Sequence, residues 1–333
     1  MKHFELTYKS KSPQTCIYPN LQSRLIQVKT KIDNFPEWEQ WKRKCNPFEF
    51  IYTNEKRLNV CRKTPISRSY FKLCEILHDF KLHHTYPRVL CIAEAPGGFI
   101  EYIVEHNLTD ELYANTMIHK DKSVPNWNYK ALKRYPFIHY THSDTNRGDL
   151  TDLTTVQNLY DQARECDLIT ADGGIDFTNN YNQQELDSYE LIYSEIYTAL
   201  RCQREGGTLI IKMFDLFYKQ TITLLSLLHQ CYTTVHCTKP HTSRPSNSEK
   251  YIVCQGYKRD PQWIQLLELY WNQKSNLPVS TDHAFLETIY QFNLQFVNRQ
   301  IGFIERVLHK HKEDYRKICE EWCDQYKVPY KTT

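Results

Sequence analysis

Glycine is scarce in this chain of 333 residues, and the placement of its nine glycines is informative. Five of them lie at or near the C-terminal ends of strands that the sequence predicts: Gly97, Gly98, Gly148, Gly173 and Gly174. Ligands of open α/β sheets bind at these strand ends. We therefore expect a ligand-binding cleft along one edge of a sheet.

Other absences narrow the class of protein. No stretch approaches ~18 consecutive apolar residues and the N-terminus has no apolar signal-peptide core, so we expect neither a membrane span nor secretion. The twelve cysteines include no Cys-x-x-Cys pair, which is typical of reduced, buried thiols in an intracellular protein. The formal net charge of +3 is too small to identify a nucleic-acid partner by itself.

The middle of the chain has the hydrophobic pattern of an α/β fold. Strands are expected at 88–94, 111–118, 137–141, 167–172, 207–214, 233–239 and 250–257. Helices are expected between them at 98–107, 127–134, 151–164, 185–204 and 219–230. This alternation predicts a doubly wound, mostly parallel sheet. Because no helix separates the last two strands, one of them should run antiparallel to its neighbour.

Both ends of the chain are expected to extend this sheet domain. A chain of 333 residues exceeds the ~100–200 residues of an average domain. The pattern before the sheet and the pattern after it are largely helical. We predict a helical N-terminal extension over 1–65, a sheet domain over 66–258 and a helical C-terminal extension over 259–333.

The stretch 88–102 predicts a ligand-binding turn between a strand and a helix. Its apolar run ends at Glu94, meets Pro96-Gly97-Gly98 and then continues with helical spacing. Glycines let the backbone pass close to a ligand, and a strand-end carboxylate can accept hydrogen bonds from an amine or a hydroxyl. Taken alone, the pattern is equally compatible with an ordinary turn between a strand and a helix.

Several charged residues stand in or beside apolar segments. Lys212 interrupts an apolar strand, Asp172 ends one and Glu249 precedes one, while Lys72 lies off the apolar face of a predicted helix. Charged residues scattered along a chain are usually solvated. Charges inside apolar strands are rare, however, and they are typical of functional sites.

Five motifs follow one another along the chain: Ser-Arg-x-x-x-Lys72-Leu-x-Glu-Ile, Glu94-Ala-Pro-Gly-Gly-Phe, Asp172-Gly-Gly, Ile211-Lys-Met-Phe and Lys239-Pro-x-x-Ser-Arg-x-x-x-Ser-Glu-x-Tyr. Their order resembles that of the FtsJ-like ribose 2′-O-methyltransferases. The last two are more similar still to those of the Adrift-type mRNA cap methyltransferases. The resemblance covers about residues 66–258 and implies a Rossmann-like class I methyltransferase sheet that uses S-adenosyl-L-methionine.

The resemblance also implies roles for individual residues. The family's catalytic tetrad falls on Lys72, Asp172, Lys212 and Glu249. Its cofactor-binding residues fall on Glu94, Ala95, Pro96, Gly97, Gly98, Phe99, Asp149, Leu150 and Asp172, with Asp149 expected to accept from the adenine amino group. Candidates for binding substrate RNA are Lys239, Ser243, Arg244 and Ser248. No metal ligand is implied.

Two positions depart from the patterns of relatives. Many relatives end the second strand with an acid that holds the cofactor ribose, whereas Asn115-Thr-Met-Ile-His119 stands here, so the ribose contact stays unassigned. Asp172 is followed by Gly-Gly and not by the Met-Ala-Pro of the ribosomal enzymes. The second departure favours the cap branch of the family and hence 5′-capped mRNA as the RNA partner.

The chemistry can also be considered from the residues themselves. Methyl transfer to a ribose hydroxyl needs in-line approach and removal of a proton from a poor nucleophile. A lysine can take that proton if its pKa falls from ~10.4 towards neutrality. We expect Lys212 to be this base, with its pKa lowered by the positive charge of Lys72, and we expect Asp172 and Glu249 to orient the lysine and the hydroxyl.

Three other patterns leave alternatives open. Five basic residues either line a phosphate track or are ordinary surface: Arg201, Arg204, Lys239, Arg244 and Lys250. Three aromatic residues either stack on a base or belong to the core: Trp127, Tyr129 and Phe217. Four C-terminal residues suggest zinc, although such spacing is common by accident: His309, His311, Cys319 and Cys323.

Alternative functions are methylation of ribosomal or transfer RNA, and RNA binding by a methyltransferase fold without catalysis. The long extensions, which the smallest ribosomal relatives lack, favour a capped substrate. An intact tetrad and cofactor turn argue against the inactive alternative, because a binding module has no need of a lysine inside a buried strand.

Overall fold

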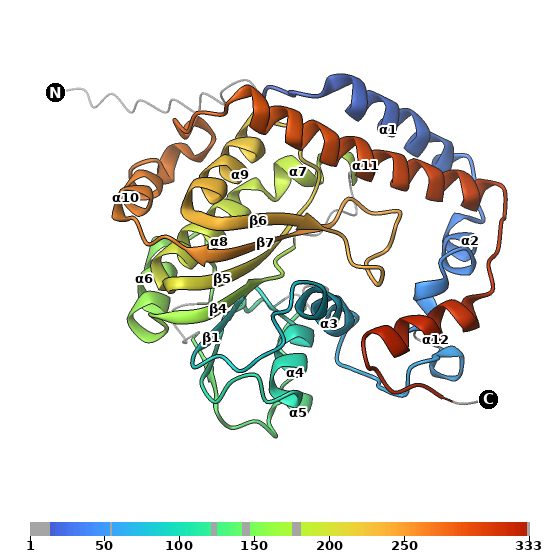
Figure 1. Ribbon diagram of the computed structural model, residues 1–333, viewed down its shortest axis with the longest axis horizontal. Helices are drawn as coiled ribbons and strands as arrows, with labels where there is room; N and C mark the ends of the chain where they lie inside the picture. The colour runs from blue at the N-terminus through green and yellow to red at the C-terminus, as the bar shows by residue number, and fades with distance from the viewer. Residues whose placement is uncertain (1–13, 54, 121–124, 142–146, 175–180, 332–333) are drawn as a thin grey trace.

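The computed structural model describes residues 14–53, 55–120, 125–141, 147–174 and 181–331. Its centre is a seven-stranded sheet with the order β3-β2-β1-β4-β5-β7-β6 (Figure 1). The strands are β1 (Val89–Ile92), β2 (Leu112–Ala114), β3 (Ile138–Tyr140), β4 (Cys166–Ala171), β5 (Gln203–Met213), β6 (Tyr232–Thr238) and β7 (Lys250–Tyr257). The first five strands pair in parallel, and β7 runs antiparallel to β5 and β6. The predicted fold class is confirmed.

Alternation along the strands separates two apolar cores, one on each face of the sheet. In β1, Leu90 and Ile92 belong to one core, and Val89 and Cys91 belong to the other. The first core is covered by α6 (Leu153–Gln162), α8 (Tyr189–Cys202) and α9 (Lys219–Cys231). The second core is covered by α3 (Ser69–Asp79) and α4 (Gly98–Glu105). This layering leaves the C-terminal ends of the parallel strands as the place for a ligand.

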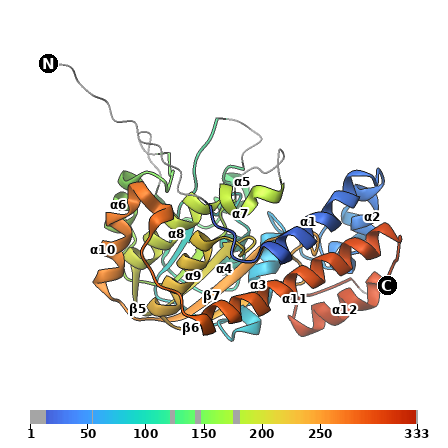
Figure 2. The same ribbon diagram turned by 90° about the horizontal axis from the view of Figure 1, so that it is seen from above.

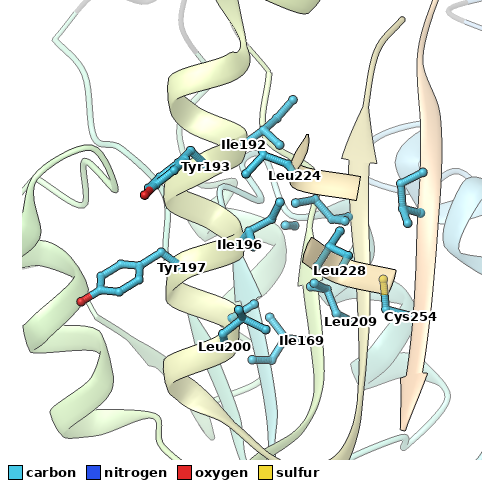
Figure 3. Close-up of a cluster of buried hydrophobic side chains, with 14 of the residues drawn as sticks. Ile169, Ile192, Tyr193, Ile196, Tyr197, Leu200, Leu209, Leu224, Leu228 and Cys254 are labelled. Carbon is cyan, nitrogen blue, oxygen red and sulfur yellow. The ribbon is translucent and has the colours of Figure 1, made fainter. Parts of the chain in front are cut away.

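Helix α8 is buried on both sides. Figure 3 shows Ile196 and Leu200 directed towards the sheet, whereas Tyr193 and Tyr197 point away from it. The outer side is covered by α10 (Pro261–Leu269) and by the 3₁₀ helix η4 (Trp271–Asn276). The Tyr193 hydroxyl donates to a backbone carbonyl of α10 at 2.6 Å, and the Tyr197 ring lies 5.2 Å from the Trp271 ring. The C-terminal extension thus packs against the main domain.

The helix expected over 185–204 is in fact two helices, α7 (Gln184–Asp187) and α8. Ser188 lies at the junction, and its hydroxyl donates to the Gln184 carbonyl at 2.6 Å. A serine side chain can satisfy a carbonyl that a helix end leaves without an intrahelical partner, which favours a break at this point. The strand that follows also begins earlier than expected, at Gln203.

The two ends of the chain pack on each other. Helix α1 (Pro19–Asp33) lies alongside α11 (His283–Leu308), as Figures 1 and 2 show, and their apolar side chains form one cluster. Helix α2 (Trp38–Lys44) contacts the same long helix, and α12 (Tyr315–Gln325) packs on the 3₁₀ helix η1 (Pro47–Phe50). Three short elements complete the fold: η2 (Lys56–Leu58), α5 (Tyr129–Leu132) and η3 (Tyr181–Gln183).

The cysteines agree with the prediction made for them. All twelve are free thiols, and ten are buried. Cys319 and Cys323 lie in the core beside α3, with the Cys319 thiol 3.1 Å from the Pro47 carbonyl, whereas His309 and His311 are exposed. These four residues do not converge, so the structure gives no support to the zinc alternative that their spacing left open. Within the described ranges, no helix is long and apolar enough to span a bilayer.

Candidate active site

A cavity of about 870 Å³ opens at the C-terminal ends of the parallel strands, and it contains all four predicted tetrad residues. One part of its lining, after β1 and β2 and around Asp149, is largely apolar and includes Ala95, Pro96 and Leu150. Another part is basic and includes Arg68 and Arg244. A cavity with one apolar part and one basic part suits a partly apolar cofactor beside a polyanion.

The centre of the site is a pair of residues from neighbouring strands. Lys212 follows the alternation of β5, in which Ile211 and Met213 enter the core, so its side chain leaves the opposite face at the strand end. The Lys212 Nζ donates to the Asp172 carbonyl oxygen at 2.7 Å and lies 3.2 Å from the Asp172 carboxylate. The Tyr251 hydroxyl donates to the same carboxylate at 2.7 Å. Lysine, aspartate and tyrosine therefore form one buried polar cluster.

A second charged pair stands beside the first. Lys72, in the first turn of α3, places its Nζ 2.8 Å from the Glu249 carboxylate, which directly precedes β7. The Ser243 hydroxyl donates to Glu249 at 2.7 Å. Burial raises the pKa of Glu249, but Lys72, Lys212 and Lys239 lower it more, so its pKa lies well below the usual range. Glu249 is therefore a permanent negative charge in the site.

The electrostatics of Lys212 differ from our expectation. Burial lowers the pKa of Lys212, but the Asp172 and Glu249 carboxylates raise it more, so the pKa lies above its ordinary value. The prediction that Lys72 lowers the pKa of Lys212 below its ordinary value was therefore wrong. The reason is geometric: Lys72 is paired at 2.8 Å with Glu249, and Lys212 faces a carboxylate at 3.2 Å.

The predicted cofactor residues divide into two groups. Ala95, Pro96, Asp149, Leu150 and Asp172 line the cavity, whereas Glu94, Gly97, Gly98 and Phe99 do not. Glu94 is buried, and its Oε1 accepts from the Phe99 amide at 2.8 Å, which ties the strand end to the first turn of α4. Its Oε2 is buried and has no hydrogen-bond partner among the described residues. Burial raises the pKa of Glu94, and the nearby charge of Asp172 raises it further.

The two glycines of the turn serve the packing of helices. A Cβ on Gly98 would lie 2.1 Å from the Ser69 hydroxyl and 3.0 Å from the Tyr70 amide nitrogen, so this glycine lets α4 begin directly against α3. Gly97 has φ +110°, and a Cβ there would lie 2.9 Å from Leu132. We expected these glycines to leave room for a ligand, and that stays a prediction. These contacts add a second reason for glycine at both positions, the packing of α4 against α3 and α5.

Two further polar groups lie on the cofactor side. The Asp149 carboxylate accepts from the Thr151 amide at 2.9 Å and from its hydroxyl at 2.8 Å, which fixes its orientation at the cavity wall. Asn115, just after β2, is 1% exposed and does not itself line the cavity. Neither its side-chain oxygen nor its nitrogen has a hydrogen-bond partner in the part of the chain that the structure describes. An orphaned buried amide is costly. It is therefore a candidate ligand for the cofactor contact that the sequence left unassigned.

Of the four candidates for binding RNA, only Arg244 lines the cavity. Ser243 and Ser248 are buried, and Lys239 is half-buried. The Lys239 Nζ donates to Asn247 Oδ1 and to the Glu249 carbonyl, each at 2.7 Å, and burial lowers the pKa of Lys239 to about 7. Lys239 and Ser243 make hydrogen bonds that hold the segment with Arg244 and Glu249 in place. The positions of Lys239, Ser243 and Ser248 therefore do not support a contact with RNA.

The basic residues that the sequence suggested for a phosphate track do not lie together in the structure. Arg204 pairs with Asp167 at the opposite end of the sheet, and Arg201 donates to Gln157 at 2.8 Å. Lys250 is buried and pairs with Asp215 at 3.1 Å. Among the aromatic candidates, Trp127 and Phe217 are core residues, and Tyr129 is 47% exposed. These residues do not gather around the cavity as a set.

Sequence reasoning missed three contributors to the site. Tyr251 ends the last motif but was given no role, and the strand register places it opposite Lys212 across the β5–β7 pairing. Glu49 binds the guanidinium groups of Arg68 and Arg244, each at 3.0 Å. Glu195 is fully buried in α8 against Gly173, and burial raises its pKa to about 8. The sequence did contain one sign that Glu195 is buried. This charged residue directly precedes Ile196, which belongs to the apolar stripe of its helix.

Comparison with known proteins gives a family match over residues 65–257, to the model described as FtsJ-like methyltransferase. A probable methyltransferase of African swine fever virus is 27% identical and covers 97% of this chain and 78% of its own. A cap-specific mRNA (nucleoside-2′-O-)-methyltransferase of Autographa californica nuclear polyhedrosis virus is 29% identical, and the match covers 73% of this chain and 88% of that protein. The Drosophila melanogaster protein named cap-specific mRNA (nucleoside-2′-O-)-methyltransferase 2 is 29% identical, and the match covers 82% of this chain and 41% of that protein.

Proposed function

Because the chain belongs to the FtsJ-like methyltransferase family, we propose that it transfers a methyl group to a ribose 2′-hydroxyl near the 5′ cap of mRNA. The observation that carries the proposal is the convergence of Lys72, Asp172, Lys212 and Glu249 on one cavity. Two lysines and two carboxylates placed side by side can bind a hydroxyl, orient it and take its proton.

The residues of the apolar side fit S-adenosyl-L-methionine, which membership of a methyltransferase family implies. Glu94 and Asn115 lie behind the cavity lining, and Glu94 Oε2 and the Asn115 amide are buried polar atoms without partners among the described residues. Such groups are suited to an amine and to ribose hydroxyls. Asp149 stands at the same wall with its carboxylate fixed, where it can accept from an adenine amino group. When bound, this cofactor supplies a methyl group made electrophilic by a sulfonium centre.

We propose Lys212 as the proton acceptor. Its raised pKa means that the ammonium form predominates at neutral pH and that the amine is a minor, strongly basic form. In the amine form, Lys212 Nζ would take the proton from the ribose hydroxyl that accepts the methyl group. Asp172 holds the lysine through the 2.7 Å bond from Nζ to its carbonyl. Lys72, fixed by Glu249, adds a positive charge that favours the developing alkoxide.

The capped substrate is supported by the relatives and by the basic side of the cavity. Two relatives whose names specify the mRNA cap match 73% and 82% of this chain, which is more than the family match alone covers. Arg43, Arg68 and Arg244 stand on the side of the cavity where an RNA chain would enter. Guanidinium groups suit phosphates because they present several donors in a plane.

The test compares a capped RNA with an uncapped RNA of the same sequence, incubated with radiolabelled S-adenosyl-L-methionine. We expect transfer to the capped RNA to be faster at equal concentration, and we expect no transfer to a control RNA with a 2′-deoxyribose at the accepting nucleotide. Equal transfer to both RNAs, or a preference for structured ribosomal or transfer RNA, would replace the cap by another substrate. An absence of transfer to every RNA, with RNA binding intact, would support an inactive RNA-binding subunit.

A further inference from the structure

Helix α2 connects the cavity to a basic surface that neither the family match nor the proposed function explains. Arg43 lines the cavity, and its neighbour Lys44 ends the same helix. Both residues precede the part of the chain that matches the family, which begins at residue 65. The helix contacts the C-terminal part of α11, as Figures 1 and 2 also show, so the two ends of the chain meet at this place.

Three lysines surround one indole ring on this surface. The ammonium groups of Lys44, Lys310 and Lys312 lie 4.9, 5.4 and 5.1 Å from the centre of the Trp41 ring. Trp41 is held in place because its Nε1 donates to Glu37 at 3.2 Å. We call Trp41, Lys44, Lys310 and Lys312 the Trp41 cluster. Cation–π attraction to a shared ring keeps three positive charges together that would otherwise repel one another.

The charges around the Trp41 cluster do not cancel. Glu37 pairs with Lys310 at 2.5 Å, and the nearby pairs Lys42–Glu39 and Arg306–Glu313 neutralise themselves. In the described part of the chain, Arg43, Lys44 and Lys312 have no carboxylate within ion-pair distance. The surface therefore keeps a net positive charge, and Lys310 and Lys312 are exposed.

The basic surface at the Trp41 cluster continues into the cavity. Arg68 and Arg244 both bind the buried carboxylate of Glu49 at 3.0 Å, and Arg68 also donates to the Tyr52 carbonyl at 2.8 Å. Glu49 occupies η1, directly after α2, so the same extension positions these arginines and the exposed lysines. Burial raises the pKa of Glu49, but Arg244 and Arg68 lower it more, and it stays ionised. Basic side chains thus run from the reacting centre to the surface.

We infer that the two extensions form a track for the phosphate backbone of the RNA that leaves the cavity. The track starts at Arg68 and Arg244, passes Arg43 on α2 and ends at the Trp41 cluster. Its ligand is single-stranded RNA, because a run of cations leading out of a narrow site follows a flexible polyanion. The inference rests on the proposed function, since an RNA substrate must be the molecule in the cavity.

The experiment measures RNA affinity against salt for the full-length protein, with a capped RNA of twenty nucleotides and with a capped dinucleotide. Lys310→Ala/Lys312→Ala is compared with Lys81→Ala/Lys258→Ala, which removes two exposed lysines that neither line the cavity nor belong to the Trp41 cluster, with the same change in net charge. Loss of two phosphate contacts should reduce the slope of log K against log salt by about 1.4 for a single strand. Between 50 and 200 mM salt, the variant should therefore lose about seven-fold less affinity for the long RNA than the unmodified protein loses.

We expect this change for the long RNA with the first variant only, while the dinucleotide binds and is methylated as by the unmodified protein. An unchanged slope for Lys310→Ala/Lys312→Ala would overturn the track. An equal change in both double variants would also overturn it, because net charge would then be the cause. If the unmodified protein bound the long RNA with the expected slope but methylated neither RNA, the proposed function would fail while the track would stand.

Discussion

The raised pKa of Lys212 can be tested by removing the charge that causes most of the increase. In Asp172→Asn the backbone carbonyl that accepts from Lys212 at 2.7 Å is kept, whereas the carboxylate at 3.2 Å is lost. Two unit charges at this distance attract by about 5 kcal/mol at an effective dielectric constant of ~20. Both side chains are only 11–12% exposed, so solvent screens little of this attraction. The amine form of Lys212 should therefore become far more accessible.

The assay is single-turnover methyl transfer as a function of pH. With the unmodified protein, the rate should rise about ten-fold per pH unit without a plateau up to pH ~9, because the pKa of Lys212 lies above its ordinary value. In Asp172→Asn the rise should level off at lower pH, whatever the absolute rate. Tyr251→Phe is the control, because it removes the 2.7 Å hydrogen bond to Asp172 and keeps the charge. A plateau near neutral pH in the unmodified protein, or an unchanged profile in Asp172→Asn, would refute the reasoning.

Two further predictions concern stability. Gly98→Ala should lower the free energy of unfolding in urea by about 1–3 kcal/mol, because its Cβ would meet the Ser69 hydroxyl and the Tyr70 amide. The control Gly302→Ala has open space inside α11 and should be neutral or stabilising by up to ~1 kcal/mol, so equal losses would count against the packing role. Glu195 has a folded-state pKa of about 8, above the unfolded value, so it costs stability progressively as pH rises from about 5 to 8. Glu195→Gln should remove this cost, and a variant that gained no stability over the unmodified protein between pH 5.5 and 8.5 would show that Glu195 is not a buried neutral acid.

The sheet could be predicted because its signals are local: apolar runs of strand length alternate with helical periods. A lysine inside such a run, as at Lys212, also stands out against its neighbours. The tetrad as a set came from the resemblance to a known family. The rule that parallel strands present their C-terminal ends at one edge brings Asp172 and Lys212 together, whereas the positions of Lys72 on α3 and of Glu249 before the antiparallel β7 required the structure.

What escaped prediction depends on neighbours that are distant in the sequence. The role of Gly98 depends on the start of α3, some thirty residues earlier. Lys239 was a candidate for contact with RNA, but its ammonium group donates to the Asn247 side chain and to the Glu249 carbonyl, because the segment up to Glu249 folds over it. The pKa of Lys212 is the balance of charges at distances near 3 Å, and a sequence contains no such distances.

The most direct test of the account locates the transferred methyl group and asks whether Lys212 is needed to transfer it. Capped RNA is incubated with labelled S-adenosyl-L-methionine and digested to nucleosides, which are identified by mass spectrometry. We expect one 2′-O-methylated nucleoside beside the cap, and a loss of turnover of about 10²–10⁴-fold in both Lys212→Ala and Lys212→Arg, with RNA binding retained. Arginine should not restore transfer because its guanidinium keeps its proton. A methyl group on a base, or near-normal turnover in Lys212→Arg, would contradict the account.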